Sequence, residues 1–171
     1  MNHKITRSQF VSKNCLVCGT DNKSGLRARF YETEKKEVIA VFRPREILQG
    51  YPDILHGGVS AAILDEVMAR AIMAHYGEYI LGLTAELKTR YKKIVPLDIE
   101  LKAIGRIVKD SRLIFEGAAE LILPDGTIAV SSEGKYFKRS LDRIVDDNFL
   151  RNHWKAPLEH APAEISLMGE S

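Results

Sequence analysis

An α+β fold, in which an antiparallel sheet wraps around one long helix, is predicted by three features of the sequence. Residues 56–76, HGGVSAAILDEVMARAIMAHY, form a long helix-patterned run with few charges. Six or so strand-like segments lie on both sides of this run. Short turn sequences connect several of these segments. A mostly apolar helix must be covered by other elements, and strands are what this chain offers to cover it.

Length and composition fit a single globular protein. The chain has 171 residues, of which 45% are hydrophobic, so it can bury a core of full size. Its 25 Lys and Arg against 23 Asp and Glu give a net charge of +2, which predicts no nucleic-acid and no membrane partner. The N-terminal residues MNHKITRSQF lack the apolar core of a signal peptide, and no run approaches the roughly 20 apolar residues of a spanning helix. We therefore expect a cytoplasmic protein.

Two strands and a loop are predicted before the helix. Residues 26–30 alternate between apolar and polar side chains, and Val38–Phe42 is continuously apolar. The charged residues 34–36 lie between them, which predicts a hairpin. Residues 43–55 contain two prolines and a glycine, so we expect a loop that leads into the helix and lines a site at its start.

Four strand-like segments follow the helix, which we expect to end at Gly77. Short turns separate the last three, one of them the sequence Pro-Asp-Gly, which predicts an antiparallel meander. The four segments are residues 79–91, 97–108, 113–123 and 127–138.

The end of the chain is predicted to form a second unit. Residues 140–153 place apolar side chains at helical spacing, and the remainder contains two prolines. We therefore expect a domain with an N-terminal loop over residues 1–139, followed by a C-terminal helix and a loosely held tail over residues 140–171.

Two cysteines, Cys15 and Cys18, form a C-x-x-C motif in a turn-rich N-terminal segment. A closed zinc site needs four ligands, and His3 is the only histidine nearby. A thioredoxin-like role needs a helix after the first cysteine, whereas this segment contains glycines and other turn residues. We therefore predict no metal and a pair of thiols packed under the N-terminal loop.

The adjacent acids Asp65 and Glu66 point in different directions on the helix, about 100° apart. Glu66 lies four residues before Arg70, which is the favourable order for an ion pair on a helix surface. Asp65 shares its face with three alanines, which leave room for a ligand or a second helix. A carboxylate in such surroundings is costly unless it is used, so Asp65 is the candidate for chemistry.

His56, Gly57 and Gly58 lie where the loop becomes the helix. The free backbone N–H groups and the dipole at this end of a helix favour negative charge, and glycine allows a carbonyl group to approach closely. This end is therefore suited to a carbonyl oxygen that becomes an oxyanion. For His56 we expect a hydrogen bond to the backbone that orients the loop.

At these residues the sequence resembles the hotdog-fold acyl-CoA thioesterases, in particular the phenylacetate-pathway type. The motif is HGGVSAAILDEVMA, with an aspartate nine residues after the histidine. The flanking sequences QGYPDILHGG, CLVCGTDNKSGL and GLTAELKTRYKKIVPL extend the resemblance over residues 14–138.

The resemblance implies a five- or six-stranded antiparallel sheet wrapped around the helix, in a homodimer whose sheets join edge to edge or in a tetramer of such dimers. It implies hydrolysis of a thioester without metal or cofactor. In this scheme Gly57 polarises the thioester carbonyl, Asp65 is the nucleophile or general base, and Thr84 positions water. Gly50 stands where some relatives carry Asn or Gln, so the neighbouring Gln49 is the candidate for that contact.

A coenzyme A substrate carries several phosphate charges, which predicts basic residues around the mouth of the site. The candidates lie near turns of the meander and are Lys92, Lys93, Arg106, Lys109 and Arg112. Two other functions stay open: a dehydratase or hydratase that uses His56 and Asp65 as a base–acid pair, and an acyl-CoA-binding module without catalysis.

Overall fold

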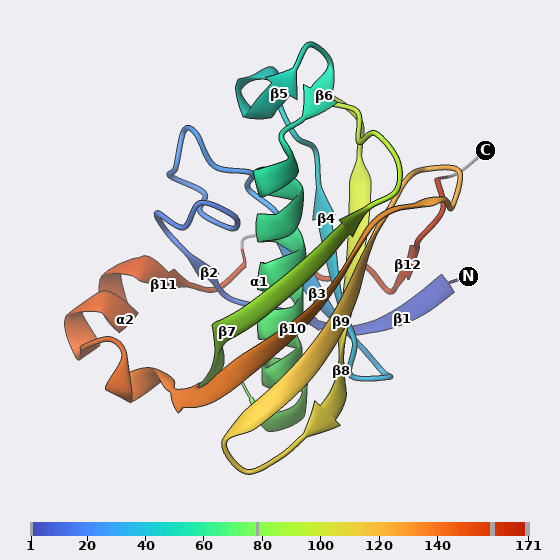
Figure 1. Ribbon diagram of the computed structural model, residues 1–171. Coiled ribbons are helices and arrows are strands. Elements are labelled where there is room, and N and C mark those ends of the chain that lie inside the picture. Colours follow the sequence, from blue (N-terminus) through green and yellow to red (C-terminus); the bar gives the residue numbers. More distant parts are fainter. Residues whose placement is uncertain (1, 78, 158–159, 170–171) are drawn as a thin grey trace.

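Helix α1 (Gly57–Tyr76) is the centre of the computed structural model, which describes residues 2–77, 79–157 and 160–169 (Figure 1). The side chain of His56 caps its first turn, and the N–H of Gly77 donates to the carbonyl of Met73 at its end. The predicted helix over residues 56–76 is therefore confirmed to within one residue.

An eight-stranded antiparallel sheet wraps around α1, and the antiparallel α+β architecture is confirmed. Six of its strands correspond to the six predicted segments, and two more extend the sheet at one edge. In sheet order the strands are β12 (Glu164–Ser166), β1 (Asn2–Ser8), β3 (Arg29–Thr33), β4 (Val38–Phe42), β8 (Leu101–Asp110), β9 (Ile114–Ile122), β10 (Ile128–Ser140) and β7 (Ile80–Tyr91).

The N-terminal segment is more regular than the loop that we expected. Residues 2–8 form β1, which pairs with β3. Residues 26–28 were predicted as the start of a strand, but β3 begins only at Arg29. The reason is that the N–H groups of Leu26 and Ala28 donate to the carbonyls of Leu16 and Val17, so these residues hold the N-terminal segment in place.

The C-terminal segment also differs from the prediction. In place of one helix from residue 140, the chain forms a 3₁₀ turn η2 (Leu141–Arg143) and the short helix α2 (Asp147–His153). Residues 160–169 include β12, and Ile165 packs into an apolar cluster with Ile39 and Ile104. This part is therefore packed against the sheet, while residues 158–159 and 170–171 of the expected tail lie outside the described residues.

Shorter elements complete the fold before the start of α1 and beside it (Figure 1). The 3₁₀ turn η1 (Glu46–Leu48) and the hairpin of β5 (Gln49–Tyr51) and β6 (Ile54–Leu55) lead into the helix. Strands β2 (Val11–Ser12) and β11 (Trp154–Lys155) pair with each other beside α2.

The core lies between α1 and the concave face of the sheet. Ile63, Leu64, Val67, Met68 and Ile72 of the helix are fully buried there. Because these positions fix how the helix sits on the sheet, Asp65 is left half-buried at the side of α1. Of the helices in the described ranges, none combines the length and apolarity needed to cross a membrane.

Candidate active site

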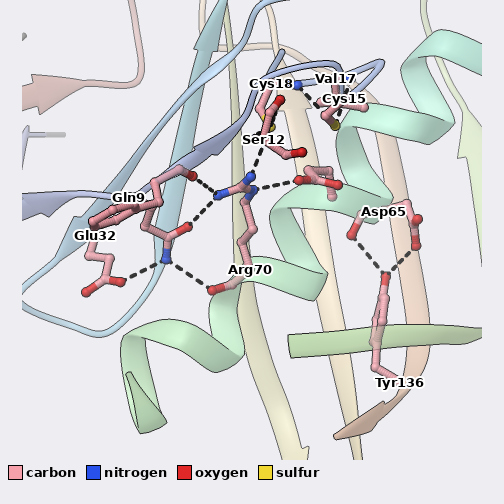
Figure 2. Close-up of polar contacts among 11 residues, drawn as sticks. Gln9, Ser12, Cys15, Val17, Cys18, Glu32, Asp65, Arg70 and Tyr136 are labelled. Carbon is pink, nitrogen blue, oxygen red and sulfur yellow. Dashed lines mark hydrogen bonds and ion pairs between the residues drawn. The ribbon is translucent and has the colours of Figure 1, made fainter. Parts of the chain in front are cut away.

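Asp65 lies two turns into α1 and is held by two hydroxyl groups from different strands. The Thr84 hydroxyl oxygen on β7 lies 2.9 and 3.1 Å from the two carboxylate oxygens. The Tyr136 hydroxyl on β10 donates to Oδ1 of Asp65 at 3.0 Å (Figure 2). Both partners are neutral, so the carboxylate is oriented without being neutralised by a cation at these contacts.

Tyr136 was not among the residues singled out from the sequence. Its ring is fully buried and stacks on Phe115 at a centroid distance of 4.9 Å. Gly134 makes room for it, since a Cβ at this position would lie 2.7 Å from the tyrosine hydroxyl oxygen. Ser132, Gly134 and Tyr136 are buried and alternate with exposed residues along β10. This alternation in the sequence could have indicated that the Tyr136 side chain faces the helix.

The surroundings of Asp65 shift its proton affinity in opposite directions. Burial is the main cause that raises the pKa of the Asp65 carboxyl group, and the charge of Glu66 adds to it. The hydrogen bonds from Thr84 and Tyr136 lower this pKa, but the net shift is upward. Burial and the Asp65 charge raise the pKa of Tyr136, so its phenol stays protonated and remains a donor.

Glu66 is separated from Asp65, as predicted, and pairs with Arg70. The Arg70 Nε atom donates to Glu66 Oε1 at 2.7 Å. The expectation of a pair on the helix surface is wrong, because Arg70 is only 5% exposed. The N-terminal segment covers it: Arg70 also donates to the Phe10 carbonyl at 2.8 Å and lies 3.2 Å from Cys18 Sγ (Figure 2).

The N-terminus of α1 presents one backbone donor without a protein partner. His56 Nδ1 accepts from the N–H of Gly58 at 2.9 Å, so the expected loop-orienting hydrogen bond is present and the Gly58 donor is occupied. The Gly57 carbonyl accepts from the Tyr91 hydroxyl at 2.8 Å. Within residues 2–77, 79–157 and 160–169, the N–H of Gly57 makes no hydrogen bond.

A cavity of about 440 Å³ lies in front of this helix terminus. His56, Gly57, Tyr91 and Lys93 contribute to its wall together with apolar side chains of β6 and of residues 94–95. Gly50 lines the cavity and Gln49 does not, so the contact of Gln49 with substrate stays a prediction.

The five basic candidates do not converge on this cavity. Lys93 lines it, and Lys92 is adjacent, with both N–H groups donating to the Ala129 carbonyl. Arg106 is bound by Glu120 through two hydrogen bonds of 2.7 and 2.9 Å. The two remaining candidates lie toward the far end of α1: Lys109 is 3.7 Å from Glu116, and Arg112 lies in a hollow beside Tyr76.

The structure does not bring Gly57 and Asp65 together within one chain. Eight residues separate them on one straight helix, which corresponds to about 12 Å along its axis. In agreement with this separation, Asp65 and Thr84 do not line the cavity at the helix terminus. The predicted site residues therefore form two clusters, one around Asp65 and one around Gly57.

In the structure Glu66 lies beside the two cysteines of the C-x-x-C motif, which the sequence did not suggest. The ligand atoms of Cys15, Cys18 and Glu66 lie within 4.8 Å of one another, whereas His3 is placed on β1 beside Glu37. Three ligands fall short of a closed zinc site. The guanidinium of Arg70 contacts both Glu66 and Cys18, which places a positive charge where a metal ion would have to bind.

Comparison with known proteins agrees with this architecture. Residues 53–130 match the model of the Thioesterase superfamily. Acyl-coenzyme A thioesterase THEM5 of Homo sapiens is 33% identical over 70 residues, which are 40% of this chain and 27% of the relative. Acyl-coenzyme A thioesterase THEM4 of Rattus norvegicus is 39% identical over 70 residues, 41% of this chain and 29% of the relative. The chain thus spans less than a third of the length of these two relatives.

Among solved structures, a thioesterase superfamily protein superposes with a TM-score of 0.65 at 28% identity. The superposition covers 74% of this chain and 61% of the other. The long central helix, the antiparallel sheet around it and this similarity together show that the chain has the hotdog fold.

Proposed function

We propose that this protein hydrolyses acyl-CoA thioesters and that Asp65 is its nucleophile or general base. The observation that carries this proposal is the half-buried Asp65 carboxylate, oriented by the hydroxyls of Thr84 and Tyr136 on the alanine-lined side of α1. Hydrolysis of a thioester needs such a group on one side of the carbonyl carbon. The names of the curated relatives support acyl-CoA as the substrate class.

The second requirement is a donor for the carbonyl oxygen, and Gly57 is suited to this role. Its N–H is the backbone donor at the start of α1 that is left without a partner in the described part of the chain. Negative charge that develops on the oxygen is favoured there by the helix dipole. His56 holds the turn through Gly58, which makes it a positioning residue.

The reaction then follows from these two groups. With Asp65 as base, a water molecule beside Thr84 loses its proton to the carboxylate and attacks the carbonyl carbon. The oxyanion collapses, the C–S bond breaks, and the thiolate of coenzyme A takes the proton from Asp65. With Asp65 as nucleophile, its oxygen attacks the same carbon, the C–S bond breaks and the coenzyme A thiolate leaves. Water then hydrolyses the resulting anhydride to the free acid and the Asp65 carboxylate.

We infer that two chains share each active site. The separation of about 12 Å between Gly57 and Asp65 along α1 is too long for both to act on one carbonyl. Strand β7 is an edge strand of the sheet and exposes Leu83, Leu87 and Tyr91. An isologous dimer through this edge would place the N-terminus of one α1 beside Asp65 of the other.

Lys92 and Lys93 are the basic residues that we assign to coenzyme A, because Lys93 lines the cavity in front of Gly57 and Lys92 is adjacent. The HGG…D motif further leads us to propose the phenylacetate-pathway branch of the fold, for which aryl acyl-CoAs are the substrates to test first.

The test is release of free thiol from short, medium, long and aryl acyl-CoAs by the purified protein. We expect turnover with at least one class, and its loss in the Asp65→Asn variant. A change in enoyl-CoA absorbance without thiol release would identify a dehydratase or hydratase instead. Saturable binding of acyl-CoA with neither reaction would identify a binding module.

A further inference from the structure

The proposed hydrolysis does not use Cys15 and Cys18, whose sulfur atoms lie together on the other side of α1 (Figure 2). Four donors surround its two sulfur atoms. Cys15 Sγ accepts from the N–H groups of Val17 at 3.3 Å and Cys18 at 3.5 Å. Cys18 Sγ accepts from the N–H of Ser12 at 3.3 Å and from Arg70 Nη2 at 3.2 Å. Such donors stabilise negative charge on sulfur, so the motif is built to hold a thiolate.

A tight turn brings the two sulfur atoms together. They lie within 4.8 Å of each other, and the N–H of Gly19 closes the turn by donating to the Cys15 carbonyl at 3.0 Å. A Cβ on residue 19 would lie 2.4 Å from this carbonyl oxygen, so only glycine fits. A disulfide of about 2 Å therefore needs only a short movement of one sulfur atom.

The two cysteines differ in accessibility and in proton affinity. Cys15 is partly exposed, whereas Cys18 is 1% exposed. The hydrogen bond from Cys18, helped by the two backbone donors, lowers the pKa of the Cys15 thiol to about 6, against the opposing effects of burial and Glu66. The same pairing and burial raise the pKa of Cys18. An accessible thiolate beside a buried thiol is the arrangement of an attacking and a resolving cysteine.

We propose that Cys15 and Cys18 form an oxidation-sensitive dithiol in which a hydroperoxide oxidises Cys15 first and Cys18 then closes a disulfide. In the first step the Cys15 thiolate attacks one peroxide oxygen, so that an S–O bond forms and the O–O bond breaks. The sulfur is oxidised to a sulfenic acid, and the peroxide leaves as hydroxide or alkoxide. In the second step Cys18 sulfur attacks the sulfenic sulfur, the S–O bond breaks, and the released hydroxide takes the Cys18 proton to form water.

Arg70 connects the cysteine pair to the rest of the fold. Its guanidinium contacts Cys18, the Phe10 carbonyl and Glu66, so it joins the N-terminal segment to α1 (Figure 2). Closing the disulfide moves the Cys18 sulfur toward Cys15, so oxidation alters the geometry of the acceptor that Cys18 offers to Arg70. The dithiol thus lies at the point where the N-terminal segment is attached to the helix.

The experiment compares oxidation of the reduced full-length protein by hydrogen peroxide at pH 7 in the native state and in urea. Intact mass after thiol alkylation should show joint loss of both thiols with a mass decrease of about 2 Da. The native rate should exceed the rate in urea by about two- to fourfold, because the much larger thiolate fraction of native Cys15 outweighs the lower nucleophilicity of its less basic thiolate. Equal rates in the two states would overturn the proposal.

Two matched variants and one measurement on the unaltered chain assign the order of events. In Cys18→Ser, Cys15 should stop at the sulfenic acid and be trapped by dimedone, whereas in Cys15→Ser, Cys18 should stay reduced over the same time. In the unaltered protein, dimedone present during oxidation should label Cys15 and not Cys18. Labelling of Cys18 first would overturn the proposal, as would one equivalent of metal bound through both cysteines after purification.

Discussion

At the scale of single residues, Asp65 and Glu66 differ in the groups that face them. Two neutral hydroxyls from β7 and β10 hold Asp65, whereas the fully charged guanidinium of Arg70 binds Glu66. This division follows from the 100° step of the helix, which is why the sequence could predict it. Tyr136 could not be paired with Asp65 in this way, because 71 residues separate them and only the fold brings them together.

The first prediction concerns the two acids. Asp65→Asn should lower kcat by on the order of 10²–10⁴, because the positioned base or nucleophile is lost. Glu66→Gln should change kcat little, since Glu66 pairs with Arg70 away from Asp65. Steady-state thiol release from the best acyl-CoA measures both variants. Equal losses in the two variants, or a fully active Asp65→Asn, would show that the assignment of Asp65 is wrong.

The second prediction concerns pH. Catalysis needs ionised Asp65, so kcat/KM should fall as the pH drops through its raised pKa. Thr84→Val removes a hydrogen bond that lowers this pKa, so the acid limb of the profile should move to higher pH. Glu66→Gln removes a negative charge that raises the same pKa, so the limb should move to lower pH. The position of the limb is the readout, and shifts of both variants in one direction would contradict the assignment.

At the scale of elements, the N-terminal segment shows what a local pattern can and cannot predict. Its glycines and asparagines correctly indicate turns around Cys15 and Cys18. The pattern did not predict β1, because that strand depends on pairing with β3 and β12, which are distant in sequence. It also did not show that the segment covers Arg70, which converts an ion pair expected at the surface into a buried one.

The third prediction is that the cysteines are dispensable for catalysis but contribute to stability. The Cys15→Ser/Cys18→Ser double variant should keep its kcat, because neither side chain contacts Asp65 or the helix terminus. Its free energy of unfolding should fall by on the order of 1–3 kcal/mol, since the shorter serine at position 18 leaves the buried Arg70 with a poorer acceptor. Urea unfolding and steady-state assays of the reduced proteins measure the two quantities. A large loss of kcat in a folded double variant would place the motif in the catalytic machinery.

At the scale of the whole molecule, the sequence predicted the wrapped helix and six strands but not the full width of the sheet. The six strands follow from apolar periodicity and turn chemistry, which are local. Strand β12 has three residues, and its place beside β1 depends on packing of Ile165 against the outer face of the sheet. The proposed arrangement of two chains is likewise beyond local patterns; the proposal rests on the exposed apolar residues of the edge strand β7.

The last prediction tests the shared active site. A protein with Asp65→Asn lacks the reacting carboxylate. Gly57→Val puts a bulky side chain into the cavity where the thioester carbonyl would approach the Gly57 N–H, and its Cβ makes an ordinary contact of 3.4 Å with the Tyr91 ring, so the helix terminus is not forced to shift. Each homodimer should be inactive. In a heterodimer of the two variants, one of the two sites combines an intact Gly57 from one chain with an intact Asp65 from the other. Activity should therefore return to at most about half of the wild-type value per dimer, because one site in two is complete.

The heterodimer is obtained by co-expression with two different affinity tags and sequential purification. Heterodimers of wild type with each variant serve as controls for subunit exchange and for folding of the variant chains. Under a shared site, each of these controls also retains one intact site. If they are active while the double-variant heterodimer stays as inactive as its parents, Gly57 and Asp65 act within one chain. In that case the helix would have to bend, or the substrate would have to move between the two clusters. The separation of about 12 Å along a straight α1 would then no longer support a site shared by two subunits.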